Sequence, residues 1–204
     1  MLFDITRGEL VGLFGADRIA TMPDGAFPPS VADTEGARLL RAVGVPMGTL
    51  ALREPDEGTG RLPLVQDVVE TGDFGNAPEG AGDWPVIGWL LNAHLALDPG
   101  SGTVHAFDAD EETVRELHTD VSSLVHVTAR FQSLLEEFAF TDDEDEEAGF
   151  ERLEREVERV RRETGDLDPL PFQDDETVWS VVGDEIAMGM RFTAGSPGGR
   201  SLYG

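Results

Sequence analysis

The chain has 204 residues, of which 40% are hydrophobic, and this is enough material for one full-sized hydrophobic core. It contains no cysteine, which excludes disulfides, thiolate catalysis and zinc sites with sulfur ligands. The formal net charge is -26, from 41 acidic and 15 basic residues, so its surface should repel bare nucleic acid and anionic membranes and attract a basic protein.

The first part of the chain predicts two short helices separated by a loop. Thr6 and Glu9 form a capping box that begins a helix over residues 6–14. Residues 22–31 are rich in Pro and Gly and predict a loop. Asp33 can cap a second helix that runs to Val43, before a Gly and a Pro.

The opening residues lack a basic region followed by an apolar stretch, and no apolar run reaches the roughly 20 residues of a membrane helix. We therefore expect a cytoplasmic protein.

The middle of the chain predicts strands over residues 47–52, 84–91, 94–97, 103–107 and 113–118. The run 84–91 is continuously apolar, as in a buried strand. Residues 98–102 form a Pro/Gly turn between two apolar arms, which predicts a hairpin. Pairing Leu97 with Thr103 across that turn sends His94 and His105 to opposite faces, and a shift of one residue would reunite them.

The last part of the chain predicts three helices. The first is capped by Ser122 or Ser123 and has an apolar stripe that includes Leu124 and Phe131. A charged helix containing Leu153 and Val157 follows, and an amphipathic stretch then covers residues 176–190. The predicted elements follow one another as helices, then strands, then helices again, and this order favours an α+β fold. We expect one domain over residues 1–192 and a flexible tail over 193–204, where little is available for burial.

Motifs that would indicate catalysis are missing from the sequence. It has no G-x-S-x-G elbow, no phosphate-binding P-loop, no dinucleotide fingerprint and no H-x-x-x-H pair. We therefore predict that the protein is not an enzyme and has no catalytic, cofactor-binding or metal-binding residues. The aromatic and aliphatic residues of the hairpin and the following helix should instead be buried together: Trp84, Trp89, Leu97, Val104, Leu124 and Phe131.

An unbroken acidic run lies between two predicted helices. It comprises Asp142, Asp143, Glu144, Asp145, Glu146 and Glu147. Such a run is typical of a solvated linker, which is the interpretation we favour. The alternative interpretation is a surface that binds a basic protein partner.

An ordered set of short motifs resembles a known family. The set comprises Trp84-Pro85-Val86-Ile87-Gly88, Leu95-Ala96-Leu97-Asp98-Pro99, Gly102-Thr103-Val104-His105-Ala106, the segment His118 to Leu124 with Ser122 and Ser123, Phe131, Asp168-Pro169, Trp179 and Gly189. This order resembles the SUKH superfamily of immunity proteins, most closely its fourth group, common in actinobacteria.

The resemblance implies an α+β domain with a mostly antiparallel central sheet and flanking helices. It also implies an intracellular protein that neutralises a cognate toxin by binding it, without catalysis or cofactor. Such toxins are often nucleases or nucleotide deaminases. The alternative that the resemblance leaves open is a regulatory or scaffold module that binds an endogenous protein.

Overall fold

A computed structural model places the helices and strands as follows, and it describes residues 1–70, 72, 74–141 and 145–203. The helices are α1 (Arg7–Phe14), α2 (Glu35–Ala42), α3 (Val65–Val68), α4 (Val121–Glu137), α5 (Glu146–Gly165), α6 (Val178–Ala187) and α7 (Pro197–Tyr203), with short 3-10 turns η1 (Ala16–Arg18), η3 (Ala81–Asp83) and η4 (Leu170–Phe172). The strands are β1 (Ile19–Ala20), β2 (Val45–Pro46), β3 (Ala51–Leu52), β4 (Val86–Leu90), β5 (Ala93–Leu97), β6 (Val104–Asp108) and β7 (Thr113–His118). The predicted α+β fold is confirmed.

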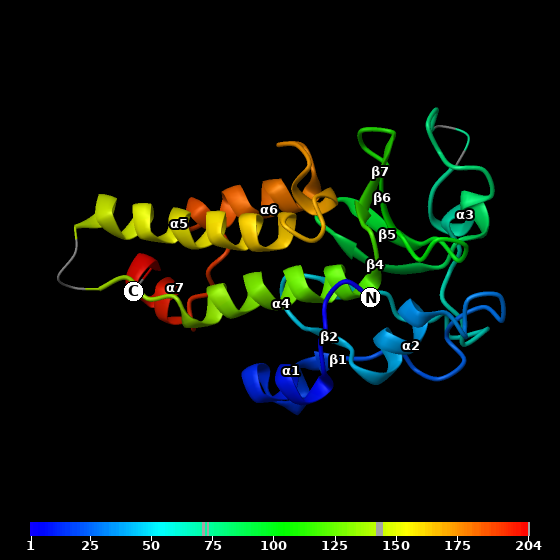
Figure 1. The fold of residues 1–204 in the computed structure, drawn as a ribbon, viewed down its shortest axis with the longest axis horizontal. Helices are drawn as coiled ribbons and strands as arrows, with labels where there is room; N and C mark the ends of the chain where they lie inside the picture. The colour runs from blue at the N-terminus through cyan, green and yellow to red at the C-terminus, as the bar shows by residue number, and fades with distance from the viewer. Residues whose placement is uncertain (71, 73, 142–144, 204) are drawn as a thin grey trace.

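The main sheet is an antiparallel meander. Its strands lie in the order β3-β4-β5-β6-β7, and β1 pairs with β2 in a separate small ladder. Figure 1 shows α4, α5 and α6 extending to one side of this sheet, with α3 at the opposite end of the molecule. The sheet is therefore covered on both faces, by the long helices on one and by α3 and η3 on the other.

The β5–β6 register differs by one residue from the predicted register. Leu97 pairs with Val104, so His105 lies opposite Ala96 and His94 lies opposite Phe107. Because side chains alternate along a strand, His94 and His105 share one face of the sheet, which corrects the prediction that they are separated. The cause is the turn, where Asp98 N donates to Thr103 O and Gly102 has a φ of +84°. Pairing Asp98 with Thr103 leaves residues 99–102 as the loop, one residue shorter than predicted, and the positive φ in this turn falls on a glycine, which adopts it readily.

Two hydrophobic clusters form on the two faces of the sheet. Leu97, Val104, Leu124 and Phe131 are buried together in the larger cluster, as predicted. The prediction that Trp84 joins them was wrong, because Trp84 is buried in the smaller cluster on the other face, beneath α3 and η3. The prediction for Trp89 was wrong, because this side chain is 44% exposed and Arg53 lies over its ring at 5.9 Å.

The helix boundaries follow from their caps. The capping box of Thr6 and Glu9 at α1 is confirmed. The cap of α2 is Thr34 rather than the predicted Asp33. The cap of α4 is Asp120, whose carboxylate accepts from the N–H of Ser123, so neither predicted serine holds that position. A carboxylate suits this place because the helix macrodipole favours negative charge there.

The residues expected to form a flexible tail include a packed helix, which corrects that expectation. Helix α7 contacts α4, and Gly198 and Gly199 are buried. A Cβ on Gly199 would lie 1.8 Å from the carbonyl oxygen of Thr193, so only glycine permits this approach. Tyr203 Oη donates to the carbonyl oxygen of Gly189 over 2.8 Å. Packing through glycine leaves no apolar periodicity in the sequence, and so this helix escaped prediction.

Candidate interaction surface

The acidic run is partly helical. Residues 142–144 lie outside the described part of the chain. Asp145 is the N-cap of α5 and accepts a hydrogen bond from Ala148 N over 2.8 Å. Glu146 and Glu147 are exposed in the first turn of the same helix, where the helix dipole favours carboxylates. For these three residues, the favoured linker interpretation is therefore wrong about secondary structure.

The acidic start of α5 opens onto a groove between α5 and α6, which we call the α5/α6 groove. It has a volume of about 710 Å³. Eight residues line it: Glu146, Glu147, Phe150, Glu151, Glu154, Asp184, Ala187 and Met188. Five of these residues are acidic and none is basic, so the groove concentrates negative charge over an apolar floor.

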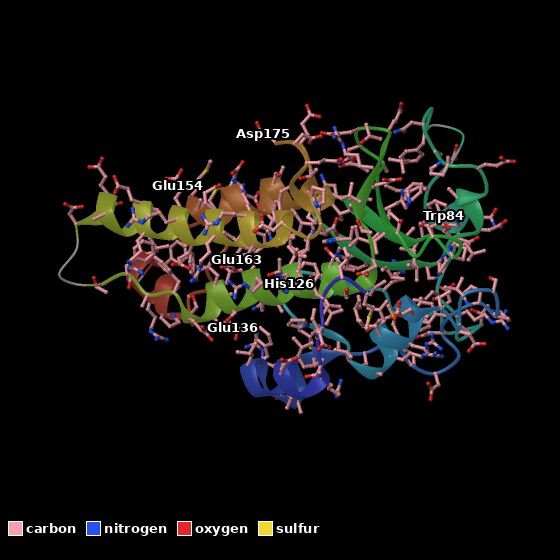
Figure 2. The ribbon with its side chains drawn as sticks, viewed as in Figure 1. Trp84, His126, Glu136, Glu154, Glu163 and Asp175 are labelled. Atoms are coloured by element: carbon pink, nitrogen blue, oxygen red, sulfur yellow. The ribbon has the colours of Figure 1, made fainter. Side chains whose placement is uncertain are left out.

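Two of the five carboxylates have a cationic partner. Asp184 pairs with Arg161 at 2.7 Å, and Glu151 pairs loosely with Arg155 at 3.6 Å. Among the residues that the structure describes, no cation lies within 4.0 Å of the carboxylates of Glu146, Glu147 or Glu154. Figure 2 shows Glu154 on the side of α5 that faces away from α4, in contrast to Glu163, which lies toward α4. The groove therefore retains negative charge that the fold does not neutralise.

The apolar floor is built from both helices. Phe150 packs against the Phe140 ring, with centroids 5.3 Å apart, and sits beside Gly189. A Cβ at Gly189 would lie 3.1 Å from the Phe150 ring, so glycine there makes room for the aromatic side chain. Met188, just past the end of α6, is 65% exposed. An exposed thioether beside a fixed ring is the kind of surface that adapts to an apolar partner.

A second hollow, between α4, α7 and the β2–β3 segment, has a volume of about 580 Å³. Its polar groups serve the fold. Gln132 Oε1 accepts from both Thr49 N and Thr49 Oγ1 at 2.9 Å. Arg18 holds Glu136 through two parallel hydrogen bonds. These pairings connect α4 to the N-terminal third of the chain.

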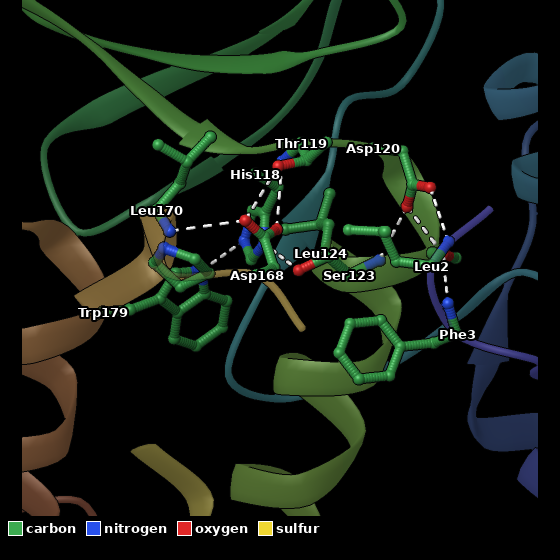
Figure 3. A network of polar contacts seen from close by, with 12 residues as sticks. Leu2, Phe3, His118, Thr119, Asp120, Ser123, Leu124, Asp168, Leu170 and Trp179 are labelled. Carbon is green, nitrogen blue, oxygen red and sulfur yellow. Dashed lines mark hydrogen bonds and ion pairs between the residues drawn. The ribbon is translucent and has the colours of Figure 1, made fainter. Parts of the chain in front are cut away.

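A buried polar network lies where β7 meets α4 and α6 (Figure 3). Trp179 Nε1 donates to His118 Nε2 over 2.7 Å. Because an indole can only donate, His118 Nε2 must accept, and its proton therefore lies on Nδ1. That nitrogen lies 2.9 Å from Ser123 Oγ, to which it donates. Burial, opposed by Asp120 and assisted by His126, lowers the pKa of His118 to about 3.

Asp168 closes this network on its other side. Its carboxylate is fully buried and accepts from Thr119 N, Thr119 Oγ1 and Leu170 N at 3.0, 2.9 and 3.3 Å. One oxygen lies 3.9 Å from His118 Nδ1. Three donors on one buried carboxylate fix the turn before η4 against the end of β7. The Asp168-Pro169 and Trp179 motifs therefore hold the long helices to the sheet.

The other motif residues also have structural roles. Ser122 Oγ donates to Asp120 and accepts from Phe3 N over 3.0 Å, which ties down the N-terminus. Asp98 accepts from Gly100 N and Ser101 Oγ and so shapes the β5–β6 turn. A Cβ at Gly88 would lie 2.6 Å from Ala51 O, so glycine lets β3 pair with β4. All of these contacts are internal to the fold, and none of them indicates that the motif residues bind a partner.

Histidine placement does not produce a metal centre in the described residues. His94 and His105 share a face of the sheet, but no cluster of three or more potential ligands forms within residues 1–70, 72, 74–141 and 145–203. The His105 ring instead packs against Trp84, with centroids 4.7 Å apart and ring planes tilted by 50°.

The acidic run noted in the sequence supplies two of the five acidic residues of the groove, and neither the other three nor the apolar residues were singled out as a surface. Glu146 and Glu147 belong to the predicted acidic run, whereas Phe150, Ala187 and Met188 were assigned to helices without a surface role. The available signal was Met188, which lies off the apolar face of Trp179, Val182 and Ile186 and just before Gly189. A large apolar residue outside a buried stripe, at a helix end, is a candidate contact residue.

Comparisons with known families agree with this architecture. No described helix combines the length and the apolar character that crossing a bilayer requires. Comparison with curated proteins and with solved structures gave no match. Residues 5–185 match the family described as SUKH-4 immunity protein. That match takes in the antiparallel sheet, α4, α5 and most of α6, and the chain therefore belongs to the SUKH-4 immunity protein family.

Proposed function

We propose that this protein is the immunity partner of a toxin, which it binds directly and neutralises in the cytoplasm without catalysis or cofactor. Membership of the SUKH-4 immunity protein family supports the toxin-immunity role. The observation that carries the binding mode is the α5/α6 groove, where Glu146, Glu147 and Glu154 have no cationic partner among the described residues. A protein of net charge -26 with such a groove suits a partner of opposite charge.

The toxin we propose is a basic nuclease or nucleotide deaminase. Enzymes that bind nucleic acid or nucleotides carry positive charge where they hold phosphate. An acidic protein is drawn to that surface over a distance set by the ionic strength, and its presence there excludes the substrate. We further propose that the acidic run at residues 142–147 accelerates this encounter. In this account the protein contacts neither nucleic acid nor membrane itself.

Co-expression with a candidate toxin, chosen from the products of the genes adjacent to its own, tests the proposal. Cells that produce the toxin domain alone should stop growing, and cells that also produce this protein should grow normally. The control is Phe131→Asp, which places a charge in the core and should abolish protection by preventing folding. Continued growth arrest in the presence of folded wild-type protein would disprove the immunity role.

A further inference from the structure

We infer that the α5/α6 groove is the docking site for a basic amphipathic helix of the partner, which inserts an apolar side chain between Phe150 and Met188 while Lys or Arg residues on either side meet the glutamates. The inference rests on the proposed function, since the helix is taken to belong to the toxin. It specifies which surface binds and what that surface recognises.

The shape of the groove supports a helical occupant. Helices α5 and α6 run side by side (Figure 1), and Gly183 allows their close approach. A Cβ at Gly183 would lie 3.2 Å from Val157 Cγ1 and 2.9 Å from a guanidinium nitrogen of Arg161. Two packed helices leave an elongated furrow along their seam, and an amphipathic helix fills such a furrow with side chains at helical spacing.

The floor of the groove supports an apolar anchor. Met188 is 65% exposed, and Phe150 and Ala187 are partly buried beside it. A thioether can change rotamer to fit an inserted side chain at little cost. An aliphatic or aromatic anchor that covers these groups would exclude water from the centre of the contact, as the strongest interface residues do.

The rim supports a basic partner. Glu147, Glu151 and Glu154 are spaced four and three residues apart, so they lie along one face of α5. The groove lies at the amino end of α5 and at the carboxyl end of α6, where the two helix dipoles oppose each other, so the negative charge of its rim comes from the carboxylates. Cations spaced three or four residues apart on a partner helix would match this row, whereas an acidic or uncharged helix would gain no such contact.

The first experiment needs no toxin. A short amphipathic helical peptide built only of leucine and lysine is titrated into ¹⁵N-labelled protein at about 0.15 M salt. Amide shifts should cluster at residues 146–154 and 184–188. The double variant Glu147→Arg with Glu154→Arg should weaken binding by at least about tenfold. The control double variant, Glu79→Arg with Glu111→Arg, changes the net charge by the same amount at exposed positions outside the groove. It should leave most of the affinity intact.

A second pair of variants distinguishes the contribution of apolar contact to peptide binding from the contribution of charge. Met188→Ser should weaken peptide binding by about fivefold, because it removes the floor without altering charge. Met190→Ser is the matched control, since Met190 is 64% exposed and does not line the groove. Shifts that map to the exposed Trp89 end of the sheet, or equal losses in groove and control variants, would overturn the groove assignment.

The same variants are then measured against the purified toxin domain by calorimetry. Loss of affinity in Met188→Ser and in the Glu147/Glu154 variant, but not in their controls, supports docking of the toxin in the groove. Toxin binding that is unaffected by the groove variants would refute the docking site and leave the proposed function intact. Binding of the peptide in the groove with no binding of the toxin domain would refute the proposed function and leave the recognition chemistry standing.

Discussion

Replacing His118 with glutamine should remove an acid-sensitive contribution from the stability of the fold. His118 is fully buried between Ser123 and Trp179, and burial lowers its pKa to about 3. The unfolded chain has the ordinary histidine pKa of about 6.5. As pH falls below about 6.5 the unfolded state takes up a proton that the folded state refuses, and the free energy of unfolding decreases until the pH approaches 3.

The size of this effect follows from the two pKa values. One pH unit corresponds to about 1.4 kcal/mol, so at a pH of about 5 the loss amounts to about 2 kcal/mol. Protonation would also reverse the role of Nε2, which accepts from Trp179 Nε1 and could not do so as an imidazolium. Glutamine cannot titrate, and its amide oxygen can accept the Trp179 hydrogen bond.

The assay is urea unfolding of wild type and His118→Gln at a pH of about 7.5 and of about 5. The variant should be less stable than wild type at the higher pH, because the Ser123 contact is lost. The difference between their free energies of unfolding, which is the gap to be measured, should narrow by about 2 kcal/mol at the lower pH. Comparing the two proteins cancels the titration of the carboxylates common to both. His94→Gln, at a partly exposed histidine, should show a much smaller change. A gap that is independent of pH would refute the assignment of a buried neutral His118.

Two further predictions concern the core and the acidic run. Phe131→Ala should reduce the free energy of unfolding by about 3–5 kcal/mol, since Phe131 is fully buried, and an unchanged melting temperature would contradict this packing. Changing all six acidic residues of the run to Asn or Gln should nearly preserve the melting temperature, because Asn at position 145 still caps α5. It should slow association with the toxin domain and weaken the salt dependence, and an unchanged rate at low salt would contradict the steering role.

Local signals in the sequence predicted much of the fold. The capping box at Thr6 and the apolar stripe through Leu124 and Phe131 gave helices that the structure confirms. These patterns succeed because each depends on residues within one or two turns of the chain. Alternation and turn residues likewise located the hairpin of β5 and β6.

The failures have physical causes that act over longer range. The register of the β5–β6 hairpin depends on the φ of Gly102, which composition does not reveal. Trp89 is apolar and lies in a strand, but only tertiary structure shows that the α3 layer stops short of it and that Arg53 covers its ring instead. The α5/α6 groove needs Met188 from one helix and Phe150 from another, and sequence spacing could not bring them together.

Neutralisation in solution tests most directly whether this protein is the immunity partner of a toxin. The activity of the purified toxin domain is measured as this protein is added. We expect saturable inhibition that is complete at stoichiometric amounts, that weakens as salt is raised, and that coincides with formation of a stable complex. Full toxin activity in the presence of excess folded protein, with no complex detected, would contradict the immunity role.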